Sequence, residues 1–340
     1  MQRAAPLPLA PGVRWTPLAL VTVLIMAAAT GSVALSPGEV LTGVWRGLSG
    51  ELSTTSDTIV WRVRLPRVLM AALVGASLAL AGVAYQGIFR NPLADPYLLG
   101  VASGASFGAA LTLTFSASVP LLALLGVPLV TFAFALLAVV LVMLLARRGR
   151  AMPITSLILA GAVLGSSFTA ATSFIMLVGR EQAAGVLAWL LGSFGLSSWS
   201  KLASTLPLML VAALAIMLAA RALNVLQLGD EQAAQLGLPV ETFKFGLIAL
   251  ATLATAAAVS VSGIIGFVGL MVPHGVRLAL GPDHRTVVPM SALLGGIFLV
   301  LADLLARTLI APAEIPIGVI TALVGGPFFL YLLRRQRSVL

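Results

Sequence analysis

Residues 97–146 read YLLGVASGASFGAALTLTFSASVPLLALLGVPLVTFAFALLAVVLVMLLA, and these fifty consecutive residues contain no charged side chain. A helix that crosses a bilayer needs about 20 predominantly apolar residues, so this stretch is too long for one span and suits two. Pro120 and Pro128 place the connecting hairpin between the two helices. The whole chain has the same character, since 60% of its 340 residues are hydrophobic and only 9% are charged. These features predict an integral membrane protein.

The composition excludes several classes of protein. A soluble domain is typically about 25% charged, so a water-soluble enzyme and a disordered chain are both excluded. The net charge of +9 does not indicate a nucleic-acid-binding protein, because the 20 Lys and Arg and the 11 Asp and Glu are scattered along the chain. The chain has no cysteine, which excludes disulfides, thiolate catalysis and cysteine-based metal sites.

Apolar stretches of the length of a span recur along the chain and give a count of ten. The first is too long for a cleavable leader, whose apolar core runs about 7–15 residues. The segment 182–200 contains four serines and three glycines, so we expect a short interfacial or re-entrant helix there. If this segment spanned the membrane instead, the count would be eleven. The ten predicted spans are about 15–35, 67–89, two within 97–146, 153–178, 202–220, two within 245–281 that break near Gly263, 287–306 and 316–333.

The distribution of basic residues predicts the orientation. Cytoplasmic loops carry an excess of Lys and Arg, and ten spans with the N-terminus inside place 13 of the 20 basic residues on that side. The predicted fold is therefore all-α and integral to the membrane, with both termini cytoplasmic. A cytoplasmic segment 1–14 precedes a single transmembrane domain 15–335, and a tail 336–340 follows it. The inner set is Arg3, Arg14, Arg90, Arg147, Arg148, Arg150, Arg221, Lys244, Arg277, Arg285, Arg334, Arg335 and Arg337.

Arginines gather at the predicted outer face. Arg64 and Arg67 are three residues apart in RLPR and share one helix face at the mouth of the second span. They either anchor the helix at the interface by snorkelling or form a basic docking patch. Asp303 and Arg307 stand four apart near the outer end of the ninth span, where they form an ion pair or bring Arg307 to the same face.

The inner connection 221–244 contains the longest hydrophilic stretch on that side. Between Gly229 and Gly237 lies DEQAAQL, which has acidic residues in its first turn and glycine stops at both ends. This pattern predicts a short exposed helix, which is either a polar turn or, as we infer from its order and length, a contact surface. In residues 87–100, the Asn, Asp and Pro residues predict a tight non-helical path.

Several kinds of chemistry are missing from the sequence. There is no G-x-x-x-x-G-K-[ST] phosphate loop and no H-E-x-x-H zinc motif, and His274 and His284 are more readily explained as interface residues than as metal or haem ligands. The interiors of the proposed spans are essentially uncharged, so no proton relay is visible. If the protein moves a solute, another chain supplies the energy. Small residues within the spans either permit close helix packing or line a mildly polar path.

The chain resembles a known family along residues 15–335. The front motif is RLPR (64–67) followed by GASLALAGVAYQGIFRNPLADPYLLGVASGA (75–105). The back motif is SGIIGFVGLMVPHGVRLALGPDHRTVVPMSALLGG (262–296), then LADLLAR (301–307) and EIPIGVITALVGGPFF (314–329). Together these stretches resemble the permeases of bacterial type II ABC importers, which take up iron-siderophores, haem and cobalamin.

The resemblance implies partners and site residues. It implies a homodimer with the solute path at the interface between the copies, two ATPase subunits on the inner side and a substrate-binding protein on the outer side. No cofactor, bound metal or nucleic acid is implied, and lipid surrounds the spans. The implied sites are Arg64, Arg67 and Arg307 for docking of the binding protein, Asp230, Glu231 and Gly237 for ATPase coupling, and Asn91, Leu93, Ile154 and Thr155 for a cytoplasmic gate.

The predicted function is therefore the permease subunit of an importer of iron chelates, either ferric siderophore or haem. It is not an enzyme, since ATP hydrolysis is expected on a partner chain. A cobalamin permease of the same family is the alternative substrate class. A stand-alone secondary transporter or channel is the alternative of a different kind, and it predicts buried ionisable residues that the spans lack. A membrane-bound enzyme would need clustered histidines or carboxylates, which the sequence does not offer.

Overall fold

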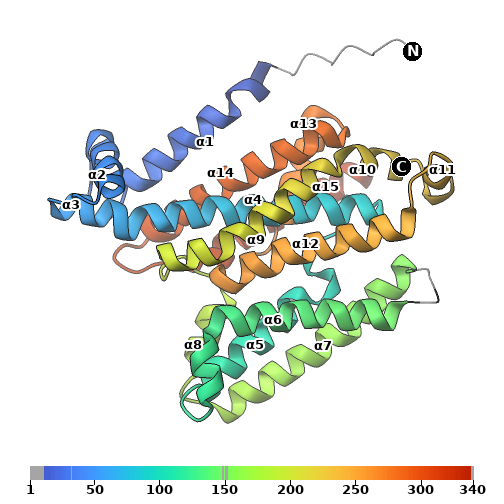
Figure 1. Cartoon of the computed structure of the whole chain (residues 1–340), viewed down its shortest axis with the longest axis horizontal. Helices are drawn as coiled ribbons and strands as arrows, with labels where there is room; N and C mark the ends of the chain where they lie inside the picture. Colours follow the sequence, from blue (N-terminus) through green and yellow to red (C-terminus); the bar gives the residue numbers. More distant parts are fainter. Residues whose placement is uncertain (1–10, 32, 148, 150–151, 338–340) are drawn as a thin grey trace.

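The computed structural model describes residues 11–31, 33–147, 149 and 152–337, and within them every regular element is a helix. Residues 1–10 of the predicted N-terminal segment, Arg148, Arg150 and residues 338–340 of the predicted tail lie outside the described residues. Figure 1 shows the long helices running roughly side by side. The helices are α1 Pro11–Ala29, α2 Pro37–Ser49, α3 Thr55–Thr58, π-helix η1 Ile59–Arg64, α4 Leu65–Phe89, 3₁₀-helix η2 Pro96–Leu99, α5 Val101–Phe115, α6 Pro120–Ala146, α7 Ile154–Val178, α8 Ala183–Leu190, α9 Trp199–Leu218, α10 Ala220–Leu226, α11 Asp230–Gln235, α12 Val240–Ser262, α13 Val268–Leu280, α14 His284–Thr308 and α15 Ile317–Arg337.

Six of these helical stretches are long and apolar enough to cross a membrane. Four shorter apolar helices occur in α1, α5, α13 and α15. Together they fall in the ten segments that the sequence predicts, although a complete crossing by all ten stays a prediction. The six long stretches are Thr55–Phe89, Pro120–Ala146, Ile154–Val178, Trp199–Leu218, Val240–Ser262 and His284–Thr308.

The segment 182–200 contains the short helix α8, as expected. Eight residues at about 1.5 Å each span only about 12 Å, far less than the roughly 30 Å of a hydrocarbon core. Residues Gly192–Ser198 then continue without regular helix to the start of α9. The alternative count of eleven spans therefore has no helix to support it here.

The first span ends earlier than the sequence suggested, at Ala29 rather than near residue 35. The last carbonyls of a helix have no partner within it and must find donors elsewhere. Arg64 Nη1 donates to the carbonyls of Ala28 and Ala29, both at 2.8 Å, and Arg307 Nη1 donates to Thr30 O at 2.7 Å. Two distant arginines thus bind the last carbonyls of α1, and the local glycine at residue 31 marks the same end.

The second span begins earlier than expected, because α3, η1 and α4 form one continuous helical stretch from Thr55 to Phe89. Its start is a capping box, in which Asp57 N donates to Thr54 Oγ1 and Thr54 N donates to the Asp57 carboxylate. Arg64 and Arg67 therefore lie inside a helix rather than at its mouth. The π-helical turn at residues 59–64 precedes Pro66, which occupies the first turn of α4.

Helix α4 is central to the packing. Figure 1 shows it running through the middle of the molecule, with α13 and α14 along one side and α5, α6 and α7 in a separate layer. Glycines allow its backbone to approach its neighbours closely. A Cβ atom added at Gly75 would lie 2.2 Å from Gly295 O of α14, and one added at Gly82 would lie 1.8 Å from Gly269 O of α13. These contacts confirm that small residues serve close helix packing in this part of the chain.

We predict that Gly82→Ala destabilises the fold. The new methyl group meets backbone rather than a movable side chain, and overpacking of this kind costs about 1–3 kcal/mol or more. The measurement is the thermal unfolding midpoint of the purified protein in detergent. The matched control is Gly246→Ala in α12, where an added Cβ meets nothing within 4 Å. This control should raise the midpoint, because alanine favours a helix by up to about 1 kcal/mol over glycine. Equal midpoints for both variants would contradict the prediction.

Candidate translocation site

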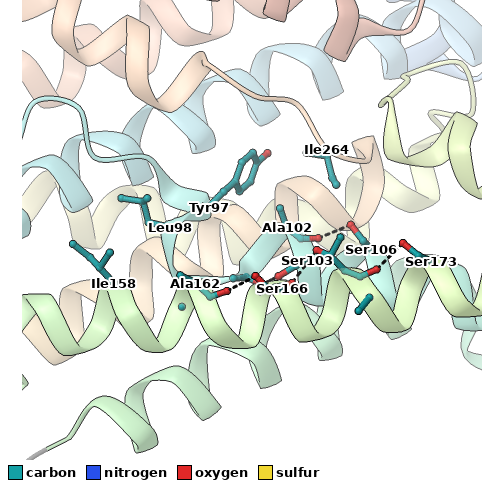
Figure 2. Close-up of a pocket in the computed structure, with 15 residues that line it drawn as sticks. Tyr97, Leu98, Ala102, Ser103, Ser106, Ile158, Ala162, Ser166, Ser173 and Ile264 are labelled. Atoms are coloured by element: carbon teal, nitrogen blue, oxygen red, sulfur yellow. Dashed lines mark hydrogen bonds between the residues drawn. The ribbon is translucent and has the colours of Figure 1, made fainter.

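A cavity of about 730 Å³ lies between α5, α7 and the turn at Tyr97 and Leu98. Figure 2 shows serines from both helices along its wall. None of its lining residues carries a charge, and most are small or bear a hydroxyl group. The lining residues are Tyr97, Leu98, Gly100, Ala102, Ser103, Ser106, Ile158, Gly161, Ala162, Gly165, Ser166, Thr169, Ala170, Ser173 and Ile264.

The hydroxyl groups on this wall use their protons within their own helices. Ser106 Oγ donates to Ala102 O at 2.7 Å, Ser166 Oγ donates to Ala162 O at 2.9 Å, and Thr169 Oγ1 donates to Gly165 O at 2.8 Å. A hydroxyl oxygen that has donated its proton still carries lone pairs that accept hydrogen bonds. The wall is therefore uncharged, and its hydroxyl donors are already bonded to backbone carbonyls. Its hydroxyl oxygens can still accept hydrogen bonds from a solute.

Helix α7 contributes the most exposed side of the cavity. Only 11% of the 18-residue apolar stretch of α7 is buried. In the helical stretch that includes α4, 78% of the corresponding 18 residues are buried. Ser166, Thr169 and Ser173 are exposed along it. An α-helix with its hydroxyl-bearing face open is incompletely covered in a single copy of the chain.

The four residues that the resemblance assigns to a gate come from two elements at one end of the molecule. Asn91 and Leu93 follow α4, and the side-chain oxygen of Asn91 accepts a hydrogen bond from Leu93 N at 2.9 Å. Ile154 and Thr155 begin α7, whose start lies at the same end as the end of α4 (Figure 1). Among the described residues, no hydrogen bond or ion pair joins the two pairs. The non-helical path expected after α4 is confirmed over residues 91–95.

Two of the three predicted docking arginines, Arg67 and Arg307, are brought together around one buried carboxylate. Asp303 is 1% exposed, and Arg67 Nη2 lies 2.9 Å from its Oδ1. Arg307 Nε lies 3.5 Å from the Asp303 Oδ2, so the expected i,i+4 ion pair is confirmed. Within the described residues, Arg64 does not form an ion pair with Asp303. It donates hydrogen bonds to carbonyls at the end of α1, the same helix end that Arg307 contacts.

These arginines are turned inward in the single chain. Arg64 is 5% exposed, and the side chains of Arg67 and Arg307 are 12% and 8% exposed. One further acidic group, Glu314, pairs with Arg67 Nη1 at 2.8 Å and is itself 42% exposed. Their role in docking stays a prediction, and the structure adds that each of them donates hydrogen bonds within the chain, although the buried Nε of Arg307 donates none among the described residues.

Sequence reasoning did not assign Asp303 as the shared counter-ion of Arg67 or Glu314 as a member of the cluster. An acidic residue within a span is expensive unless it is paired, and this cost was the available signal for Asp303. Glu314 carried no such signal, because it lies in the connection between α14 and α15. The hydrogen bonds from Arg67 lower the pKa of Glu314 below its ordinary value of 4.5.

The short helix expected between Gly229 and Gly237 is present as α11. Glu231 and Gly237 are exposed, and Gly237 has a φ of +88°, which favours glycine at the end of this helix. The side chain of Asp230 is also 42% exposed, but its Oδ2 is paired with Lys244 Nζ at 2.5 Å. The two exposed residues are therefore free for a partner, whereas Asp230 is engaged within the chain.

The two histidines lie apart from any cluster of ligands. His274 of α13 makes an edge contact with Phe328, and His284 Nδ1 lies 2.9 Å from Asn224 Oδ1. Within the part of the chain that the structure describes, no group of three His, Asp or Glu side chains is arranged to hold a metal ion.

Comparison with known proteins defines the class of protein. The model of the FecCD transport family matches residues 19–335. The cobalamin import system permease protein BtuC of Halobacterium salinarum is 45% identical over 82% of this chain and 74% of that protein. The hemin transport system permease protein HmuU of Yersinia pestis is 41% identical over 84% of this chain and 87% of that protein.

A solved structure assigned to the metal-chelate type of ABC transporter, in an inward-facing conformation, is also similar. It superposes with a TM-score of 0.83 at 33% identity and covers 95% of this chain and 98% of that one. The protein is a multi-pass permease subunit of an ABC transporter in the inner membrane, and it is not an enzyme. The chain belongs to the FecCD transport family.

We predict that Asp303→Asn destabilises the chain far more than Glu314→Gln does. Asp303 is the buried counter-ion of two arginines, and removing one partner of a buried ion pair costs about 3–5 kcal/mol. Glu314 is partly exposed, and loss of such a pair costs about 1 kcal/mol or less. Thermal unfolding in detergent at neutral pH measures both differences.

Acidification supplies a second test of the Glu314 pair. Because the folded-state pKa of Glu314 is lowered, its stabilising contribution is fully present above its ordinary pKa and is lost as the pH falls through the lowered value. The difference between wild type and Glu314→Gln should therefore shrink as the pH falls below about 4.5. A difference that is independent of pH would show that the carboxylate charge does not act there.

Proposed function

We propose that the protein is the permease of a homodimeric, ATP-driven importer that moves an iron chelate, either ferric siderophore or haem, inward across the membrane. The observation that carries this proposal is the uncharged, hydroxyl-lined cavity on the open side of α5 and α7. Family membership supplies the class of transporter, and the cavity supplies the chemistry of the path.

The open face of α7 supports the homodimer. A hydroxyl-bearing helix face gains little from lipid, whereas small residues allow a second helix to approach closely. A second copy of this chain that covers α7 would close the cavity into a path shared by two subunits. Such a path lies between chains rather than within one, which agrees with the dense packing around α4.

The chemistry of the wall supports a bulky solute that carries its own hydrogen-bond donors. Lone pairs of Ser106, Ser166 and Thr169 accept hydrogen bonds, and no fixed charge holds the solute in place. Weak, dispersed contacts suit passage rather than capture, so a separate binding protein would provide affinity. Haemin and cobalamin are the cargo that two relatives' names state, and a cobalamin permease is the alternative for this chain.

The topology that we propose has ten spans and both termini in the cytoplasm. The apolar helices support the number, and the 13 basic residues on the inner side support the orientation. In this orientation α11 faces the cytoplasm, where the exposed side chain of Glu231 and the exposed Gly237 would contact an ATPase. The gate formed by Asn91, Leu93, Ile154 and Thr155 would close the inner end of the path.

The outer surface would receive the binding protein. Arg67 lies near the start of α4 and Arg307 near the end of α14, and Glu314 pairs with Arg67. These two helix ends lie at the end of the molecule opposite to α11 (Figure 1). We propose that acidic side chains of the binding protein engage this cluster. Arg64 would support the surface mainly by holding the end of α1.

The path is tested by placing a large side chain on α7. Ser166→Trp should reduce uptake about tenfold or more, because filling the path adds a steric cost of about 1–3 kcal/mol. The control is Ser167→Trp, since Ser167 is also exposed and also bonds its own helix but does not line the cavity.

Uptake is measured in proteoliposomes that contain the full transporter, with a ferric siderophore, haemin and cyanocobalamin offered separately as probes. The probe that is transported identifies the cargo class. Equal uptake by the Ser166→Trp and Ser167→Trp variants would contradict the assignment of the path.

The energy source is tested through α11. We expect an ATPase to copurify with the permease and uptake to require ATP. Glu231→Arg should lower the solute transported per ATP hydrolysed, because it reverses the charge of an exposed residue on the proposed contact helix. The control is Glu181→Arg. Glu181 is also exposed, but it follows the C-terminal end of α7, whereas the proposed gate residues lie at the N-terminal end of that helix. Uptake by the permease alone without ATP would instead establish a stand-alone secondary transporter.

A further inference from the structure

The short helix α11 is tied to the last turn of α4. The turn that leads into α11 contains Gln227, whose Nε2 donates to Gly87 O at 3.0 Å. Gly229 then has a φ of +111°, and a Cβ atom added there would lie 3.4 Å from Arg90 Nη1. The backbone conformation at residue 229 therefore favours glycine, and the arginine side chain lies in ordinary van der Waals contact with this position. The start of α11 is built to lie against the end of α4.

Lys244 of α12 holds Asp230 in place. The side chain of Lys244 is 5% exposed, and its Nζ lies 2.5 Å from Asp230 Oδ2. A buried ammonium group needs a counter-charge, and Asp230 is the carboxylate that pairs with it among the described residues. The Oδ2 atom of Asp230 is therefore bonded to α12 through Lys244.

The other oxygen of Asp230 faces Arg90. Arg90 Nη2 lies 3.6 Å from Asp230 Oδ1, close enough for an ion pair and too far for a hydrogen bond. Asp230 Oδ1 is buried and accepts no hydrogen bond within the described part of the chain. A buried oxygen in this state is costly, and a small approach of Arg90 would satisfy it. The pair thus has room to tighten.

Arg90 is also the residue that starts the gate loop. It ends α4 with a φ of +48°, an uncommon conformation for a residue other than glycine, and Asn91 and Leu93 follow directly. The hydrogen bond from Leu93 N to the Asn91 side chain makes the start of this loop a compact unit. A displacement of Arg90 would therefore move both proposed gate residues of this loop together.

We propose that Arg90 and Lys244 are positioning residues of the transport cycle, and that Asp230 connects the movement of α11 to the loop that follows α4. Lys244 is the fixed anchor, because its ammonium group is buried and lies 2.5 Å from Asp230 Oδ2. Arg90 is the adjustable contact, because its side chain is 39% exposed and its separation from Asp230 is long. This inference rests on the proposed function, in which an ATPase acts on α11.

The expected strengths of the two ion pairs of Asp230 support this assignment of Lys244 as the anchor and Arg90 as the adjustable contact. A half-exposed ion pair contributes about 0.2–1 kcal/mol, so the Arg90 contact can break and form again within a cycle. Separating Lys244 from Asp230 would leave an ammonium group that is only 5% exposed without its counter-charge, so the Lys244 contact should persist throughout.

The absence of cysteine from the chain allows a direct test. Pro92→Cys places one thiol at an exposed position in the loop, and the measurement is its rate of labelling by a maleimide in the full permease–ATPase complex. Rates are compared without nucleotide and with ATP and vanadate. We expect nucleotide to change the rate in the otherwise wild-type complex, and Arg90→Gln to reduce this change about two- to fivefold.

Three companions make the test specific. Arg90→Lys should retain most of the nucleotide-dependent change, because it keeps the positive charge. Arg147→Gln should behave as wild type, since Arg147 is an exposed arginine at the same end of the molecule whose Nε donates to Gly149 O. Asp230→Asn combined with Arg90→Gln should have no greater effect than Asp230→Asn alone, as expected for residues that act through one contact.

The outcomes separate this inference from the proposed function. If no ATPase associates with the permease, the proposed function fails. If the complex forms but nucleotide leaves the labelling rate unchanged, or Arg90→Gln matches Arg147→Gln, only the inference is overturned. Loss of the ATPase from the complex on Arg90→Gln would also overturn it, because Arg90 would then contact the ATPase directly.

Discussion

The close approach of α4 to α13 and α14 is the constraint on which the rest of the structure depends. In a bilayer, helices gain little from hydrophobic association, so backbone proximity and dispersion contacts hold them together. Gly75 and Gly82 allow α4 to meet its neighbours with no side chain between the backbones. This packing makes α4 a rigid axis, with the proposed outer docking cluster near one end and the proposed gate loop at the other.

The few charges of the protein are concentrated at the two ends of that axis. At one end, Asp303 forms ion pairs with Arg67 and Arg307. At the other end, Asp230 forms ion pairs with Lys244 and Arg90. In each cluster one carboxylate joins elements that are distant in sequence. The cavity between the two ends has no charged residue in its lining. Fixed charge therefore organises the surfaces where partners are proposed to act and is absent from the proposed path.

Much of the helical organisation could be predicted from periodicity and composition. The break near Gly263 and the exposed helix between Gly229 and Gly237 occur where the sequence places them. The connection between α5 and α6 was predicted at Pro120–Pro128 but lies at residues 116–119, because Pro120 occupies the first turn of α6 and Pro128 lies within that helix, after a kink at Gly126. The remaining errors lie at helix ends, one of which depends on distant arginines and the other on a local cap. Arg64 and Arg307 end α1, and the capping box at Thr54 starts the second span early. For the proposed sites, the sequence indicated the Asp303–Arg307 pair but not the pairing of Arg67 with Asp303 and Glu314 or that of Asp230 with Lys244.

The sequence by itself determined that the chain is a bundle of apolar helices with charges at their ends, because hydrophobic length and turn residues are local properties. It also carried the motifs that place the chain in its family. Only the tertiary structure decided that Arg67 shares Asp303 with Arg307 and that Asp230 pairs with Lys244. Ion pairs between distant segments depend on how helices are rotated and stacked, and the packing of the glycines on α4 sets that arrangement.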